Sequence, residues 1–171
     1  ILMFVLVLSF TIGGTLAWLT DTTEPVTNTF TYGDINITLA ETTEVYKMVP
    51  GNSISKDPSV TVESDSEACW LFVKVENGLG NAEATGNTTI AAQMAAKGWS
   101  LLDGTGNIYA YRTTVTAGAD IKVFESFKIA DNADVAAYEG AKINVTAYAV
   151  QADGFETAAA AWAAAGPDDS S

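Results

Sequence analysis

Short stretches in which apolar and polar residues alternate recur along the chain. Ile35, Ile37 and Leu39 alternate with polar residues, and Val60 and Val62 do so further on. A period of two is typical of a strand with one buried face. The pattern predicts seven or eight strands, at residues 30–39, 44–49, 59–63, 69–75, 99–102, 108–112, 122–129 and 142–151.

Helical patterns are few and short. They cover residues 89–97 (with Thr88 as the expected cap), 133–138 and the alanine-rich stretch 155–165. Many short strands with few helices indicate an all-β fold. We expect a jelly-roll-like β-sandwich with short decorating helices and an extended N-terminal segment. One position disturbs the pattern: in residues 122–129, Phe124 falls on the opposite face from Val123 and Phe127.

The N-terminal residues predict export. An apolar run over residues 1–10 is followed by two glycines and then by the small residue Ala17. This order is typical of a signal peptide, with cleavage expected between Ala17 and Trp18. A membrane anchor or a retained hydrophobic assembly segment is the alternative, although the apolar stretch is marginal in length for a span.

The expected cleavage site and the strand pattern together divide the chain into three parts. Residues 1–17 form the signal peptide or hydrophobic export segment, residues 18–31 an extended N-terminal strand, and residues 32–171 the β-sandwich domain. Pro25 and the lack of helical periodicity support an extended conformation after the cleavage site.

Charge and composition exclude several functions. Eight Lys and Arg against twenty-one Asp and Glu give a net charge of −13, so binding to nucleic acid is not expected. The chain has no histidine, which removes Ser-His-Asp catalysis and the usual zinc sites. We therefore expect no catalytic residues, no cofactor and no enzymatic activity.

The single cysteine and a group of oxygen-bearing residues could carry chemistry, but both are explained by the expected fold. The single cysteine, Cys69, lies in an apolar strand pattern and is expected in the core, with a reactive thiol or intermolecular disulfide as the alternative. The oxygen-rich residues 103–107 could contact calcium, but they lack the glutamate of an EF-hand and are better explained as a turn. No metal ligand is assigned.

Several segments resemble the TasA/camelysin family. The similar stretches are residues 13–21 (GGTLAWLTD), 26–31 (VTNTFT), 50–58 (PGNSISKDP), 69–75 (CWLFVKV) and 148–155 (YAVQADGF). The first, which spans the expected cleavage junction, is the most specific. Members of that family are exported by Gram-positive bacteria through a SipW-type signal peptidase.

The resemblance implies a structural subunit of a biofilm matrix fibre, secreted or held at the cell surface. It implies a homopolymer that grows by donor-strand complementation, with contacts to other matrix proteins. Trp18, Leu19, Val26 and Phe30 would be the apolar contacts of the donor strand. A flexible leader with no assembly role is the plainer alternative for this segment.

Two other functions stay open. One is a monomeric cell-surface adhesin or binding domain, for which no clustered aromatic or acidic site is evident. The other is a camelysin-type secreted metalloprotease, which the absence of histidine opposes.

Overall fold

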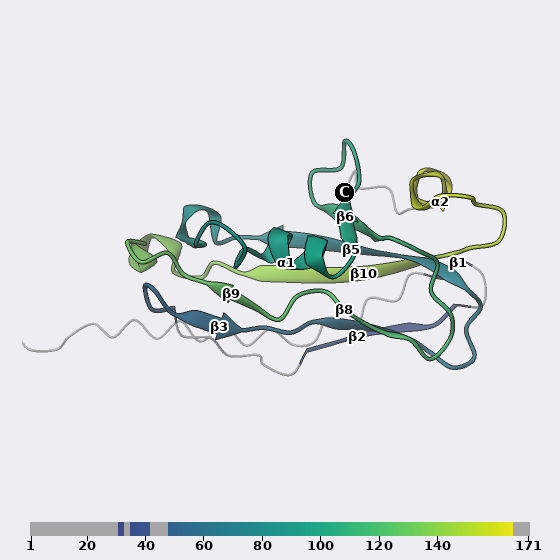
Figure 1. Cartoon of the computed structure of the whole chain (residues 1–171), viewed down its shortest axis with the longest axis horizontal. Helices are drawn as coiled ribbons and strands as arrows, with labels where there is room; N and C mark the ends of the chain where they lie inside the picture. The colour runs from purple at the N-terminus through teal and green to yellow at the C-terminus, as the bar shows by residue number, and fades with distance from the viewer. Residues whose placement is uncertain (1–30, 33–34, 42–47, 166–171) are drawn as a thin grey trace, which may run out of the picture.

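The strands are arranged in two layers, as the computed structural model shows (Figure 1). It describes residues 31–32, 35–41 and 48–165. The first layer is a five-stranded sheet whose strands are, in spatial order, β1 (Thr31–Tyr32), β10 (Ile143–Gln151), β5 (Cys69–Asn77), β7 (Ile108–Tyr111) and β6 (Trp99–Leu101). All its neighbours are antiparallel except β1 and β10, which are parallel.

The second layer consists of two smaller antiparallel sheets. One contains β2 (Ile37–Ala40), β4 (Ser59–Val62) and β8 (Asp120–Lys122), and the other contains β3 (Ser53–Ser55) and β9 (Ser126–Lys128). The helical elements are η1 (Gly80–Ala82), α1 (Ile90–Ala96), η2 (Val135–Tyr138) and α2 (Ala158–Ala165). The all-β class is therefore confirmed, whereas the jelly-roll topology stays a prediction.

A break in pairing separates the two smaller sheets. The backbone of Lys56 donates to Glu125 (3.1 Å), and that of Val123 donates to Pro58 (2.8 Å), so the two strand pairs remain joined across the break. Because the chain leaves the regular pleat here, Val123 and Phe124 are both 0 % exposed although they are consecutive. The strand expected over residues 122–129 is thus wrong: it is two strands, β8 and β9, in different sheets.

The main core lies between the two layers. Its members come from the inward faces of both and include Val60 and Val62 of β4, Val73 of β5, and Val145 and Ala147 of β10. Strict alternation along β4 and β10 fills this core, as the sequence predicts.

A second, smaller core lies on the outer face of the large sheet. Helix α2 packs there against Phe72 and Val150, and its Trp162 ring lies 4.9 Å from that of Phe72. Burial of both faces explains why Val150 is only 2 % exposed although alternation along β10 directs it away from the main core.

Other expectations are met or corrected in detail. The hairpin around residues 103–107, the strand at 69–75 and the strand at 142–151 are confirmed. The strand expected at 30–39 is wrong, because β1 and β2 belong to different sheets. No strand covers residues 48–49, and residues 44–47 lie outside the described part. The cap of α1 is Thr89, not Thr88, since the Thr89 side chain accepts from the Ala92 backbone.

Candidate functional site

The residues expected to mediate assembly or processing precede the described part of the chain. Ala17, Trp18, Leu19, Val26 and Phe30 all lie outside the described residues. Strand β1 begins directly after Phe30, and it shows where this segment reaches the folded domain: beside β10.

Counting only the described residues, strand β10 has one fully paired edge and one edge along which few residues pair. It pairs with β5 along all nine of its residues. On the other side β1 pairs only with Ala149 and Val150. Among the described residues, no strand pairs with residues 143–147 on that side. A strand edge of this kind can add a further strand.

The sequence of β10 contains no charged side chain that would disfavour the addition of another strand. Strand β10 reads INVTAYAVQ and carries no charged residue. Natural edge strands are commonly protected by lysine, proline or bulges. Ile143, Val145 and Ala147 face the main core, while Asn144 and Thr146 face outward, so an added strand would meet a half-apolar surface.

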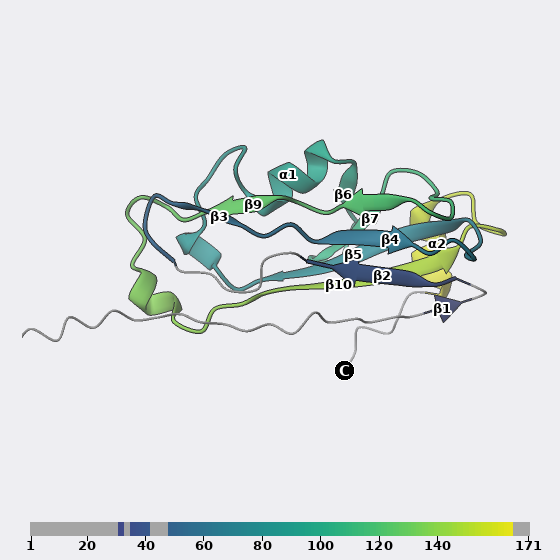
Figure 2. The ribbon, with the colours of Figure 1, turned by 90° about the horizontal axis from the view of Figure 1, so that it is seen from below.

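Strand β2 borders the same side of the sandwich. It lies close to β10 although the two belong to different layers (Figures 1 and 2). The edges of both sheets therefore meet along one seam of the molecule. We call the β10 side of this seam, residues 143–147, the open edge.

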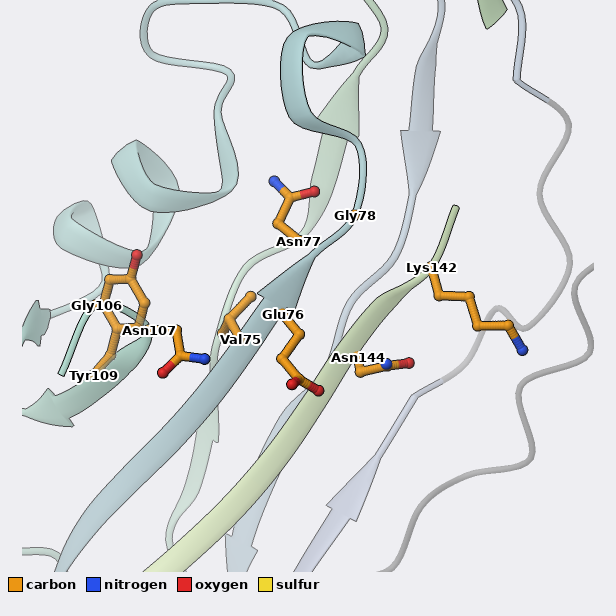
Figure 3. Close-up of a pocket in the computed structure, with 9 residues that line it drawn as sticks. All are labelled: Val75, Glu76, Asn77, Gly78, Gly106, Asn107, Tyr109, Lys142 and Asn144. Carbon is orange, nitrogen blue, oxygen red and sulfur yellow. The ribbon is translucent and has the colours of Figure 1, made fainter. Parts of the chain in front are cut away.

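A shallow polar groove lies at one end of the large sheet (Figure 3). It has a volume of ≈ 620 Å³ and is lined by Val75, Glu76, Asn77, Gly78, Gly106, Asn107, Tyr109, Lys142 and Asn144. In Figure 3 the Lys142 and Asn144 side chains point away from Asn107 and Tyr109, so the lining groups do not converge on one point. Burial and the Glu83 carboxylate raise the pKa of Tyr109, which keeps this phenol protonated.

The chain packs tightly at the same place. The Gly78 backbone donates to the Lys142 carbonyl at 2.8 Å, and a Cβ at Gly78 would lie only 2.7 Å from that oxygen. Glycine is therefore required where β5 leaves β10. Gly78 therefore has a structural role, which is to let the two strands approach closely.

Two potentially reactive side chains, a thiol and an amine, are buried and contribute to the packing of the fold. Cys69 is 0 % exposed, and burial raises the pKa of its thiol to about 11, so it is a core residue without nucleophilic character at neutral pH. Lys56 is 2 % exposed and forms an ion pair of 2.7 Å with Glu41. This pair joins the end of β2 to the break between β3 and β4.

Residues 1–67 match the family model described as camelysin metallo-endopeptidase. Over these residues, the match agrees with the resemblance to the TasA/camelysin family seen in the sequence. The match covers the N-terminal segment and β1 to β4, and it ends before β5. No curated protein and no solved structure matches the chain.

The camelysin description names a metal-dependent peptidase, and two observations bear on it. The described residues contain no group of three or more His, Cys, Asp or Glu side chains placed to hold a metal ion. The whole sequence has no histidine, so any zinc would lack the imidazole ligands that catalytic zinc sites commonly use. Within the described part, no helix is both long and apolar enough to cross a membrane.

Sequence reasoning missed the open edge itself. The strand at residues 142–151 was expected, but nothing in its sequence says which of its sides has a partner. The absence of charged residues from β10 is the one feature of the sequence that could have pointed to an edge able to accept a strand.

Proposed function

We propose that this protein is a structural subunit of an extracellular filament or biofilm matrix fibre. Subunits would assemble by donor-strand complementation, with the N-terminal segment of one pairing with the open edge of the next. The observation that carries this proposal is the uncharged open edge, residues 143–147, with which no strand of the described part pairs, close to where β1 joins the sheet. The TasA/camelysin match supports it.

The proposal includes the route by which the subunit reaches its place of assembly. A signal peptidase would cleave between Ala17 and Trp18 during export, leaving the protein extracellular or at the cell surface of a Gram-positive bacterium. N-terminal sequencing of the secreted protein should read Trp18 first; a mature chain beginning at Ile1 would contradict this and favour a retained hydrophobic segment.

If Thr31 and Tyr32 of the donor take the place of the accepting subunit's own β1, the register of β1 defines how a donor strand would lie. Thr31 is opposite Ala149 and Tyr32 is opposite Val150, in parallel. Continued toward the N-terminus, this register places Val26 opposite Asn144. Partners in a sheet point to the same face, so Val26 would lie on the outer face of the large sheet, and Thr27 on the side of the core.

The energy of such a contact has two sources. Ladder hydrogen bonds contribute roughly 1 kcal/mol net each. Burial of an apolar side chain such as Val26 or Phe30 adds about 1.5–3 kcal/mol. Together these terms oppose the cost of ordering the segment and of bringing two subunits together.

A disulfide trap tests the register and the origin of the strand at once. In a V26C/N144C variant the two Cα atoms would lie within disulfide range if the register is right. Oxidised filaments should then give a ladder of covalent oligomers on a non-reducing gel. Cys69 does not interfere, because it is fully buried.

The matched control is T27C/N144C, whose two side chains would point to opposite faces. It should give no ladder. A V26C/N144C protein that forms only internally linked monomers would show that the segment pairs with its own subunit, and would overturn assembly through this edge.

Deletion of the donor segment tests assembly directly. A chain lacking residues 18–28 should stay folded and soluble and should not polymerise, as judged by circular dichroism and electron microscopy. A peptide of residues 18–30 should stop growth of wild-type filaments. Truncated protein that forms filaments of normal appearance would place the contacts elsewhere.

The family description makes proteolysis the second candidate function. The absence of histidine argues against it, because no imidazole can hold a metal or relay a proton. Purified protein should not cleave casein, with or without added zinc. Cleavage that a chelator abolishes would establish the peptidase function instead.

A further inference from the structure

The outer edge of β9 is closed by a glutamine side chain. Ser126 of β9 pairs with Ser55 of β3 on one side. On its other side, Gln93 Nε2 donates to the Ser126 carbonyl at 2.6 Å, and Gln93 Oε1 accepts from the Ser126 N–H at 3.3 Å. Oε1 also accepts from the Glu125 N–H at 3.2 Å. The amide thus makes the same two bonds that a residue of an added antiparallel strand would make with Ser126.

Neighbouring positions along this side are closed as well. The Lys128 carbonyl accepts from the Ala84 backbone at 2.7 Å, and the Ala130 N–H donates to Ala82 at 2.8 Å. On β8, the indole N–H of Trp99 donates to the Lys122 carbonyl at 2.9 Å. Each of these contacts occupies a backbone group that would otherwise point out of the sheet.

Helix α1 holds Gln93 in this position. The Thr89 cap fixes the first turn of the helix, and Met94, 0 % exposed, anchors the helix in the main core. Gln93 Nε2 also donates to the Thr88 carbonyl at 3.0 Å. Lys97 Nζ lies 2.7 Å from Glu125 Oε1 and ties the last turn to the same edge.

We infer that Gln93 helps to direct where a second copy of this chain can attach: it occupies the Ser126 backbone groups that an added strand would need at β9, and so favours strand addition at β10. This inference rests on the proposed function. A subunit with two accepting edges would branch, whereas one with a single accepting edge grows as an unbranched chain.

The test is a Gln93→Met variant in the full chain, because methionine keeps the length of the side chain but makes neither bond. Hydrogen exchange of the Ser126 amide should become about tenfold faster or more, since its partner is lost. Sedimentation should show added self-association, and electron microscopy should show branched or laterally joined fibres. The control Ala95→Met places the same side chain on an exposed position of α1, and it should behave as wild type.

A Gln93→Glu variant separates capping from folding. Its carboxylate keeps the acceptor for the Ser126 N–H, so exchange at Ser126 should stay closer to wild type than in Q93M. If Q93M shows wild-type exchange, or faster exchange with unchanged association, the inference is wrong. Wild-type protein that forms no filaments would defeat the proposed function alone, because Q93M can still be compared with wild type by sedimentation.

Discussion

The residues that look most reactive in this sequence are held in the interior. Cys69 pairs with Gln151 of β10 on one side, and on the other side its backbone bonds that of Val115 in both directions, at 2.9 and 2.8 Å. The side chain contributes to the main core. Its inertness follows from burial, which disfavours the thiolate.

The Cys69 thiol should react with Ellman's reagent at neutral pH only after the protein unfolds. Its pKa in the fold is about 11 against 9.0 for an ordinary thiol. Because folding raises this pKa, the folded protein favours the protonated thiol. The resulting contribution to the free energy of unfolding is complete below pH 9 and is lost as the pH rises through about 11. Urea midpoints measured from pH 8 to 11 should fall more steeply for wild type than for Cys69→Ala. Equal slopes would show that the thiol does not ionise with unfolding.

The buried Lys56 should matter more than any surface ion pair. Replacing it with methionine leaves the Glu41 carboxylate without its 2.7 Å partner, and we expect a loss of about 3 kcal/mol in the free energy of unfolding. The control Lys122→Met removes a pair of 3.6 Å whose lysine side chain is 48 % exposed, and it should cost about 1 kcal/mol or less. Urea denaturation measures both. Similar losses in the two variants would contradict a special role for burial.

Elements differ in how clearly their sequences specify them. Strands β4 and β10 were predictable because one face of each is buried and a period of two results. The division of residues 122–129 was not, since it depends on the facing Pro58, a residue distant in sequence. Likewise, Thr88 and Thr89 are equivalent as caps in the sequence. Only the position of Ala92 decides between them.

Helix α2 should be attached to the sandwich mainly through one tryptophan. Trp162 contacts the rings of Phe72 (4.9 Å) and Tyr148 (5.5 Å), whereas the rest of the helix is alanine. We expect Trp162→Ala to cost about 2–3 kcal/mol, less than for a fully buried Trp because the side chain is half-buried.

The loss should be local. Hydrogen exchange should rise throughout Ala158–Ala165 while the amides of β4, in the main core, keep their protection. An exposed control, Ala164→Ser, should leave exchange close to wild type. Uniform loss of protection across both layers would instead show that α2 and the sandwich unfold as one unit.

At the scale of the whole molecule, charge opposes association. The chain carries a net charge of −13, so copies of it would repel each other as they approach in the proposed assembly. The donor segment of the proposed site stays a prediction from the sequence, since Trp18, Leu19, Val26 and Phe30 lie outside the described residues. The open edge could not be predicted from the sequence, because pairing is a property of the assembled sheet.

Salt should therefore accelerate filament growth. The screening length falls from about 30 Å at 0.01 M to about 8 Å at 0.15 M ionic strength. Between these conditions, the lag time of light scattering by the mature protein should shorten. Sucrose at equal osmolarity is the control, because it does not screen charge. A lag time that is unchanged by salt would mean that repulsion does not limit assembly.

The parallel direction of β1 and β10 has a mechanical consequence. A donor strand that continues this direction lies lengthwise along β10, so tension on a fibre would run along the strands and load their hydrogen bonds together, in shear. Strand β10 would then transmit the force to β5 through pairs along all nine of its residues. Such a joint resists pulling much better than one whose bonds open one after another from an end.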